Sequence, residues 1–143
     1  MSTATGTGPL DGPAEAFARF RSLVLANDGA GFTGDMLAED VLVEFPFAPE
    51  GGVRDVRGRE AFLRFARAGR AALPVRFTGV HDVTLHETAD PEVAVAEYSL
   101  AAEHVATGRT LRSAFAMVLR VRDGRIVHCR EYQNAAAMAA ALT

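Results

Sequence analysis

The sequence predicts an α+β fold in which N-terminal helices pack against a curved antiparallel sheet and enclose an apolar pocket. Two observations predict it. Apolar residues recur at spacings of three and four in two N-terminal segments, and from Pro74 onward they alternate with polar residues. The first period is that of an amphipathic helix, and the second is that of a strand with one covered face. Helices followed by consecutive strands indicate α+β rather than βαβ repeats.

The helices are predicted over Pro13–Ala26 and Arg59–Ala72. Pro13 opens the first, and Asn27-Asp28-Gly29 ends it. In the second helix we expect Phe62, Phe65 and Ala66 to face inward and Arg64, Arg67 and Arg70 to face outward. A helical turn over Thr33–Leu37 is predicted to lead into a strand at Val41–Phe45, and Ala135–Leu142 is predicted to form a short terminal helix.

Four long strands are predicted over Val75–Leu85, Val93–Val105, Thr110–Val121 and Arg125–Gln133. A two-residue turn at Thr107-Gly108 would pair Ala106 with Arg109 and continue outward from there. This register pairs His104 with Leu111, Ala102 with Ser113, Leu100 with Phe115 and Tyr98 with Met117, all on one face. Glu103 would then face Arg112 on the other side, which suits solvent, so the first face is predicted to be the covered one.

The last strand has two possible orientations. A three-residue loop at Arg122-Asp123-Gly124 puts Cys129, Glu131 and Gln133 on the covered face. A two-residue loop reverses the three side chains, because neighbouring strand residues point to opposite faces.

Composition restricts the function. The net charge is −3 and the pI is near 5.8, which argues against a nucleic-acid partner. All 15 basic residues are Arg, so lysine Schiff-base chemistry is excluded. The single cysteine, Cys129, excludes an internal disulfide. We expect residues 1–12 to form a disordered leader before a single domain at 13–143, no membrane association and a cytoplasmic location, because no secretory signal or apolar run of membrane-spanning length is present.

Two motifs fail on context. Residues 29–34 read GAGFTG and match GxGxxG, but they follow a helix rather than a strand and are predicted to be a flexible loop. His81 and His86 are five residues apart on a strand and therefore point to opposite faces, so no metal site is predicted. We expect no cofactor.

Three segments carry a family resemblance. Residues 37–47 (LAEDVLVEFPF), 57–62 (RGREAF) and 123–132 (DGRIVHCREY) resemble the SnoaL-like and ketosteroid-isomerase-like families of the nuclear-transport-factor-2-like superfamily. The resemblance spans roughly residues 13–140. It implies a cone-shaped roll around a pocket and, commonly, a homodimer. Members include isomerases, polyketide cyclases, epoxide hydrolases and non-catalytic binding modules.

The known catalytic groups of these families are replaced. At the positions that match the base and the two oxyanion donors of ketosteroid isomerases, this chain has Phe45, Phe20 and Met117. At the positions that match the epoxide-hydrolase triad it has Tyr98, Leu100 and Glu131, of which only Glu131 keeps a carboxylate. Neither apparatus is intact.

Glu131 is therefore the leading catalytic candidate. A carboxyl group in an apolar pocket has a raised pKa that suits acid–base chemistry near neutral pH. His104 and Tyr98, on the same predicted face, are candidates to steady oxygen charge on a substrate. The predicted substrate-binding residues are Phe20, Phe45, Phe65, Leu100, Ser113, Phe115, Met117, Cys129 and Gln133.

These residues lead to a hypothesis about function. It is a cofactor-independent cyclase or isomerase that acts on a small hydrophobic molecule of polyketide or terpenoid type. Two alternatives stay open: a non-catalytic ligand-binding or accessory dimerisation module, and an epoxide-opening enzyme in which Glu131 activates water.

Overall fold

The computed structural model describes residues 7–142 and contains a six-stranded sheet with helices on one side. The elements, in chain order, are α1 (Pro13–Ala26), the 3-10 turn η1 (Gly34–Met36), β1 (Leu37–Glu44), β2 (Asp55–Arg57), α2 (Arg59–Ala72), β3 (Val75–Glu87), β4 (Val93–His104), β5 (Thr110–Arg122), β6 (Arg125–Gln133) and α3 (Ala135–Leu142). The predicted helices and long strands are present. The three-residue strand β2 was not predicted.

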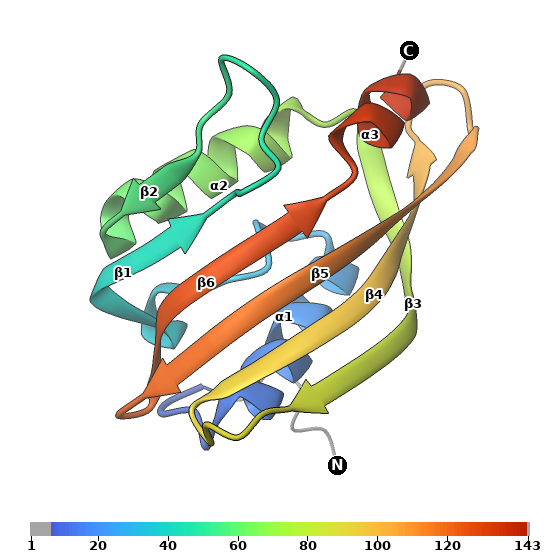
Figure 1. Ribbon diagram of the computed structural model, residues 1–143. Helices are drawn as coiled ribbons and strands as arrows, with labels where there is room; N and C mark the ends of the chain where they lie inside the picture. The colour runs from blue at the N-terminus through green and yellow to red at the C-terminus, as the bar shows by residue number, and fades with distance from the viewer. Residues whose placement is uncertain (1–6, 143) are drawn as a thin grey trace.

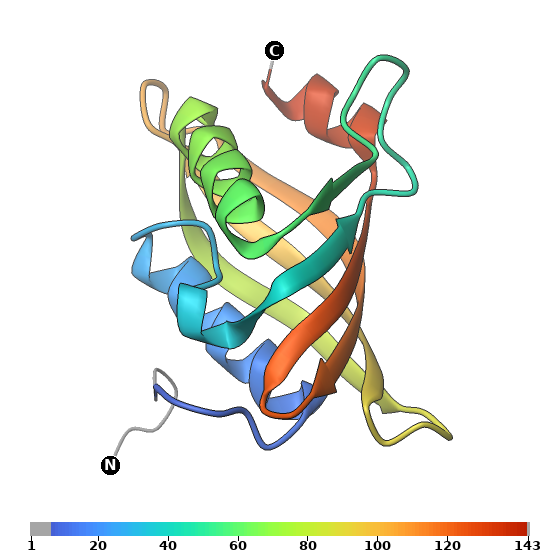
Figure 2. The same cartoon turned by 90° about the vertical axis from the view of Figure 1, so that its left-hand side faces the viewer.

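The sheet is open and curved. Its strand order is β2-β1-β6-β5-β4-β3, and β3 to β6 form an antiparallel meander. β1 lies parallel to β6, and the short β2 pairs with β1 at the edge. Helices α1 and α2 lie on the same side of the sheet, where its curvature makes it concave (Figures 1 and 2). The α+β cone predicted from the sequence is therefore confirmed.

Helix α1 forms the floor of the cone. Pro13 occupies its first turn, where a missing N–H costs nothing, and Asn27 ends it in the left-handed region at φ 56°. The apolar stripe includes Ala16, Phe17 and Phe20, which are buried against the sheet. The 3.6-residue period of these side chains predicted this face correctly.

The β4–β5 hairpin differs from its predicted register by two residues. The N–H of His104 donates to the carbonyl oxygen of Arg109 (2.8 Å), so the connection is the four-residue loop 105–108 rather than a two-residue turn. Tyr98 consequently pairs with Phe115, and Leu100 pairs with Ser113. The predicted partners are wrong. The predicted face is right, because a slip of two residues preserves the side on which every residue lies.

The β5–β6 hairpin also differs from the prediction. The turn has two residues, Asp123 (φ 51°) and Gly124 (φ 79°), and Arg122 pairs with Arg125. Such a turn alone would send Glu131 to the outer face. An extra residue in β6 prevents this: Val121 pairs with Ile126 but Arg120 pairs with His128, so the strand bulges at Val127. Glu131 thereby returns to the concave face, opposite Met117.

Residues 8–12, predicted to belong to a disordered leader, instead pack on the domain. Leu10 is buried in the core, and its N–H donates to the carbonyl oxygen of Gly124 (2.9 Å). Arg19, which is 4% exposed, donates to the carbonyl oxygens of Gly8 (2.8 Å) and Pro9 (3.4 Å) and pairs with Glu15 (2.6 Å). Polar composition did not indicate these contacts, because a distant arginine supplies them. The predicted leader residues 1–6 lie outside the described part of the chain.

The core fills the narrow end of the cone. Its most deeply buried large side chains are Met36, Leu37, Val41, Val43, Met117, Leu119 and Ile126. The wide end, between α2, the end of α1 and strands β3 to β6, is where a pocket remains. Of the helices in residues 7–142, none has the length and apolar character needed to cross a membrane.

Candidate functional site

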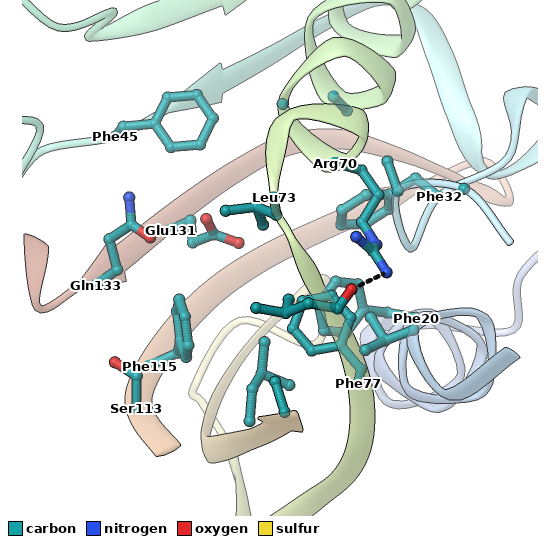
Figure 3. Close-up of a pocket in the computed structure, with 18 of the residues that line it drawn as sticks. Phe20, Phe32, Phe45, Arg70, Leu73, Phe77, Ser113, Phe115, Glu131 and Gln133 are labelled. Atoms are coloured by element: carbon teal, nitrogen blue, oxygen red, sulfur yellow. Dashed lines mark hydrogen bonds between the residues drawn. The ribbon is translucent and has the colours of Figure 1, made fainter. Parts of the chain in front are cut away.

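A pocket of about 240 Å³ lies between the concave face of the sheet and helices α1 and α2. Most of its wall is apolar (Figure 3). The lining residues are Phe20, Val24, Gly29, Ala30, Phe32, Phe45, Phe62, Phe65, Ala66, Gly69, Arg70, Leu73, Val75, Phe77, Leu100, Ala102, Leu111, Arg112, Ser113, Phe115, Glu131 and Gln133. A concave, apolar site with a few polar groups is typical of small-molecule binding.

Aromatic rings from separate elements form much of this wall. Phe20 of α1 contacts Phe32 with ring centroids 5.1 Å apart, and Phe32 contacts Phe62 of α2 at 5.6 Å. Phe45, just after β1, contacts Phe65 of α2 at 5.5 Å. Rings in such contacts favour flat, apolar ligands, which offer them stacking surface.

Glu131 is the acidic residue of this wall. Its carboxylate points into the pocket between Gln133 and Leu73 (Figure 3), and across the strand pair it lies opposite Met117. Within residues 7–142 the Glu131 carboxylate has no hydrogen bond and no ion pair. Because the protein around it replaces water without offering a donor, desolvation raises the pKa of Glu131 from 4.5 to about 7.

This environment makes Glu131 competent as both acid and base. A group whose pKa lies near the working pH holds substantial fractions of both protonation states, which is the condition for efficient proton transfer in either direction. The predicted orientation of Glu131 is confirmed by the strand register.

Two neutral polar side chains share the pocket wall with Glu131. Gln133 is the next inward residue of β6, and Ser113 is the next inward residue of β5 after Phe115. The Ser113 hydroxyl is buried and has no hydrogen-bond partner among the residues that the structure describes. An unpaired buried hydroxyl lowers stability, and a ligand carbonyl or hydroxyl in the pocket would satisfy it.

Arg70 is the main departure from the predicted helix faces. It was expected to face outward, yet it lies on the pocket wall. Its Nη2 donates to the carbonyl oxygen of Val75 (3.0 Å) and to Asn27 Oδ1 (3.2 Å), and its guanidinium lies 4.8 Å from the centroid of the Phe77 ring. The prediction was wrong because Arg70 is in the last turn of α2, where β3 and the end of α1 approach the helix (Figure 3).

The predicted site residues divide by depth. The structure brings Glu131, Phe20, Phe45, Phe65, Leu100, Ser113, Phe115 and Gln133 to the pocket wall. Met117 and Cys129 face the same side but are buried beneath the wall and do not line it. Burial raises the pKa of the Cys129 thiol, so it is an inert apolar side chain.

Tyr98 and His104 also lie off the pocket wall. Tyr98 is 2% exposed and stacks on Phe115 at 5.5 Å, and its hydroxyl has no hydrogen-bond partner within residues 7–142. Burial, with a smaller effect from the charge of Glu131, raises the pKa of Tyr98. His104, at the end of β4, accepts a hydrogen bond at Nδ1 from the N–H of Ala106 (3.3 Å). Of the three predicted catalytic residues, the structure brings only Glu131 to the pocket.

The loop at residues 29–34 contributes more than was predicted. Gly31 is buried with φ 88°, and a Cβ there would lie 2.7 Å from Phe20 Cε1. The glycine therefore permits a close approach to α1 that brings Phe32 over the pocket. The glycine pattern was a signal for this packing, although it was interpreted as flexibility. The other aromatic lining residues that were not predicted, Phe62 and Phe77, come from α2 and β3.

No group of three or more His, Cys, Asp or Glu side chains placed to hold a metal ion occurs among residues 7–142. His81 and His86 do not belong to a shared site among these residues. His86 pairs with Glu97 (2.6 Å) on the outside of the sheet.

Comparison with known proteins identifies the family. Residues 17–129 match the SnoaL-like domain. The chain belongs to the SnoaL-like family. An uncharacterized PhzA/B-like protein of Pseudomonas aeruginosa is 35% identical over 111 residues, which cover 78% of this chain and 77% of that protein. Glu131 and Gln133 lie just beyond residues 17–129, which match the SnoaL-like domain. The roles of these two side chains are therefore argued from their position in this structure.

Solved structures share the SnoaL-like cone. A Bacillus subtilis protein provisionally named an isomerase superposes with a TM-score of 0.78 and 26% identity, over 90% of both chains. A Pseudomonas putida protein provisionally named a polyketide cyclase gives a TM-score of 0.69 with 20% identity, over 90% of this chain and 96% of that one. The second comparison shows the fold alone.

Proposed function

We propose that this SnoaL-like protein is a cofactor-independent isomerase or cyclase that acts on a small hydrophobic molecule of polyketide or terpenoid type. The observation that supports it is the unpaired Glu131 carboxyl in an aromatic pocket, with a pKa of about 7. The names of the Bacillus and Pseudomonas neighbours, isomerase and polyketide cyclase, agree with this class of chemistry.

The proposed step is a proton transfer at carbon. The Glu131 carboxylate removes a proton from a carbon next to a substrate carbonyl, which leaves an enolate and a neutral carboxylic acid. In an isomerisation the acid returns the proton to another carbon of the enolate. In a cyclisation the enolate carbon bonds to a second carbonyl carbon, and the acid protonates the oxygen released from that double bond. Both routes restore the Glu131 carboxylate.

The remaining groups of the wall would hold the substrate. The aromatic rings fix a flat substrate in one orientation and exclude water, which preserves the raised pKa of Glu131. The Gln133 amide, on the next inward residue of β6, is a donor for a carbonyl oxygen on which negative charge develops. The Ser113 hydroxyl, further along β5, is a donor for a more distant polar group of the ligand.

Deuterium exchange into α-tetralone, an apolar bicyclic ketone, tests the proposal. We expect the protein to accelerate exchange at the carbon next to the carbonyl, with a rate that rises with pH and levels off above about 7 as Glu131 ionises. Glu131→Gln should abolish the acceleration. Glu39→Gln, which removes an exposed carboxylate on β1, serves as the control and should leave it unchanged. Equal exchange in the wild type and Glu131→Gln would refute the acid–base role.

One observation favours a second candidate, a non-catalytic binding module. Only one of the three predicted catalytic residues lines the pocket. A binding module would take up α-tetralone without accelerating exchange, so the same experiment separates the two functions.

A further inference from the structure

Arg70 lies on the wall of an apolar pocket and has no acidic partner in the part of the chain that the structure describes. Other arginines form ion pairs: Arg112, also on the pocket wall, pairs with Asp82 (2.6 Å), and Arg120 pairs with Asp90 (2.9 Å). Within residues 7–142, Arg70 bonds only to the neutral oxygens of Val75 and Asn27. Its positive charge is therefore not neutralised by any acidic side chain among these residues.

The guanidinium is held in place from one edge. Both of its hydrogen bonds leave from Nη2, and its Cζ lies over the Phe77 ring, 4.8 Å from the ring centroid. A guanidinium has five N–H donors, so the three on Nη1 and Nε have no partner among residues 7–142. Both N–H groups of Nη2 are in use, so a carboxylate would accept a hydrogen bond from Nη1 or from Nε, and the fixed guanidinium loses little conformational freedom when it donates one.

Asn27, the residue that ends α1, holds Arg70 in this position. Its Nδ2 donates to the carbonyl oxygen of Phe77 (2.9 Å), and its Oδ1 accepts from the N–H of Phe77 (2.7 Å) as well as from Arg70. The end of α1 is thereby joined to β3 and α2 around a single amide. These hydrogen bonds hold the guanidinium of Arg70 at the pocket wall, where its charge can reach a ligand.

We propose that Arg70 binds a carboxylate of the ligand, so that the pocket takes flat apolar acids in preference to neutral molecules of the same shape. The apolar body would lie among the phenylalanine rings, and the reacting part would face Glu131, which comes from the opposite wall (Figure 3). This proposal names the substrate class of the site described above and rests on that site's being a ligand pocket, but it does not require turnover.

Binding of 2-naphthoate and of its neutral analogue 2-naphthamide tests the proposal. At pH 6 the naphthoate is ionised, whereas Glu131, with its pKa of about 7, is mostly neutral and does not repel it. We expect wild type to bind the naphthoate more tightly. In Arg70→Gln the naphthoate affinity should fall by about tenfold to a hundredfold, as for loss of a hydrogen bond to a charged group, while the naphthamide affinity should stay within about twofold.

Two further variants complete the test. Arg67→Gln removes an exposed arginine one turn earlier in α2 and should change neither affinity. Arg70→Lys keeps the charge but not the planar guanidinium that Val75, Asn27 and Phe77 hold in place, so its naphthoate affinity should lie between those of wild type and Arg70→Gln. Equal losses for both ligands in Arg70→Gln, or no loss for the naphthoate in either Arg70 variant, would overturn the assignment. Because the readout is binding, these results are independent of whether Glu131→Gln abolishes proton exchange.

Discussion

The raised pKa of Glu131 predicts an unusual dependence of stability on pH. In the folded protein the carboxyl has a pKa of about 7, and in the unfolded chain it has a value near the ordinary 4.5. Between these two values the folded state holds a proton that the unfolded state has released. Rising pH therefore favours unfolding across this window, and the contribution of Glu131 is constant above about pH 7 and below about pH 4.5.

The size of the effect follows from the two pKa values. The difference between 4.5 and about 7, at about 1.4 kcal/mol for each pH unit, corresponds to about 3 kcal/mol of unfolding free energy. Water that enters the pocket reduces this figure, because the side chain is only half-buried, and we expect about 2 kcal/mol.

Urea denaturation of wild type and Glu131→Gln at pH 5, 6, 7 and 8 measures this contribution of Glu131 to the unfolding free energy. Glutamine has no ionisable proton, so the stability of the variant relative to wild type should increase by about 2 kcal/mol from pH 5 to pH 8. Glu39→Gln should show no such change, since Glu39 is exposed. If the curves of wild type and Glu131→Gln against pH run parallel, Glu131 is not desolvated, and the argument for its acid–base role fails.

Two further predictions concern packing. Tyr98→Phe should raise the unfolding free energy by about 1 kcal/mol, because the buried Tyr98 hydroxyl has no partner; a loss of more than about 1 kcal/mol in urea denaturation would show that the hydroxyl is bonded. Gly124→Ala should lower stability by about 1 to 2 kcal/mol, since Gly124 has φ 79° and a Cβ there would lie 2.9 Å from Pro9 Cβ. Gly108→Ala, with φ 71° but open space around it, should cost less in thermal melts, and equal losses would show that contact with Pro9 adds nothing.

The sequence alone determined the elements and the fold class. Hydrophobic periods of 3.6 and 2 are local properties, so they located α1 and α2 at their observed bounds and the long strands to within two residues. The three-residue strand β2 was missed, because a period cannot be recognised in so short a segment.

The tertiary structure alone decided which side chains meet in the pocket. Glu131 was predicted to face inward from a three-residue loop, but the observed cause is a two-residue turn combined with a bulge at Val127. The alternation of β5 and β6 does not reveal that bulge, because an extra residue is a property of the pairing between two strands.

The same reason explains Arg70. Its place in the helical period indicated solvent, and only the approach of Asn27 and Phe77, 43 and 7 residues away in the chain, turns that position into part of the pocket wall. A sequence period states which face of an element is apolar. The packing of the elements decides which distant residues cover the remaining faces. In this site, packing brings the charged side chains Arg70 and Glu131 to the pocket wall.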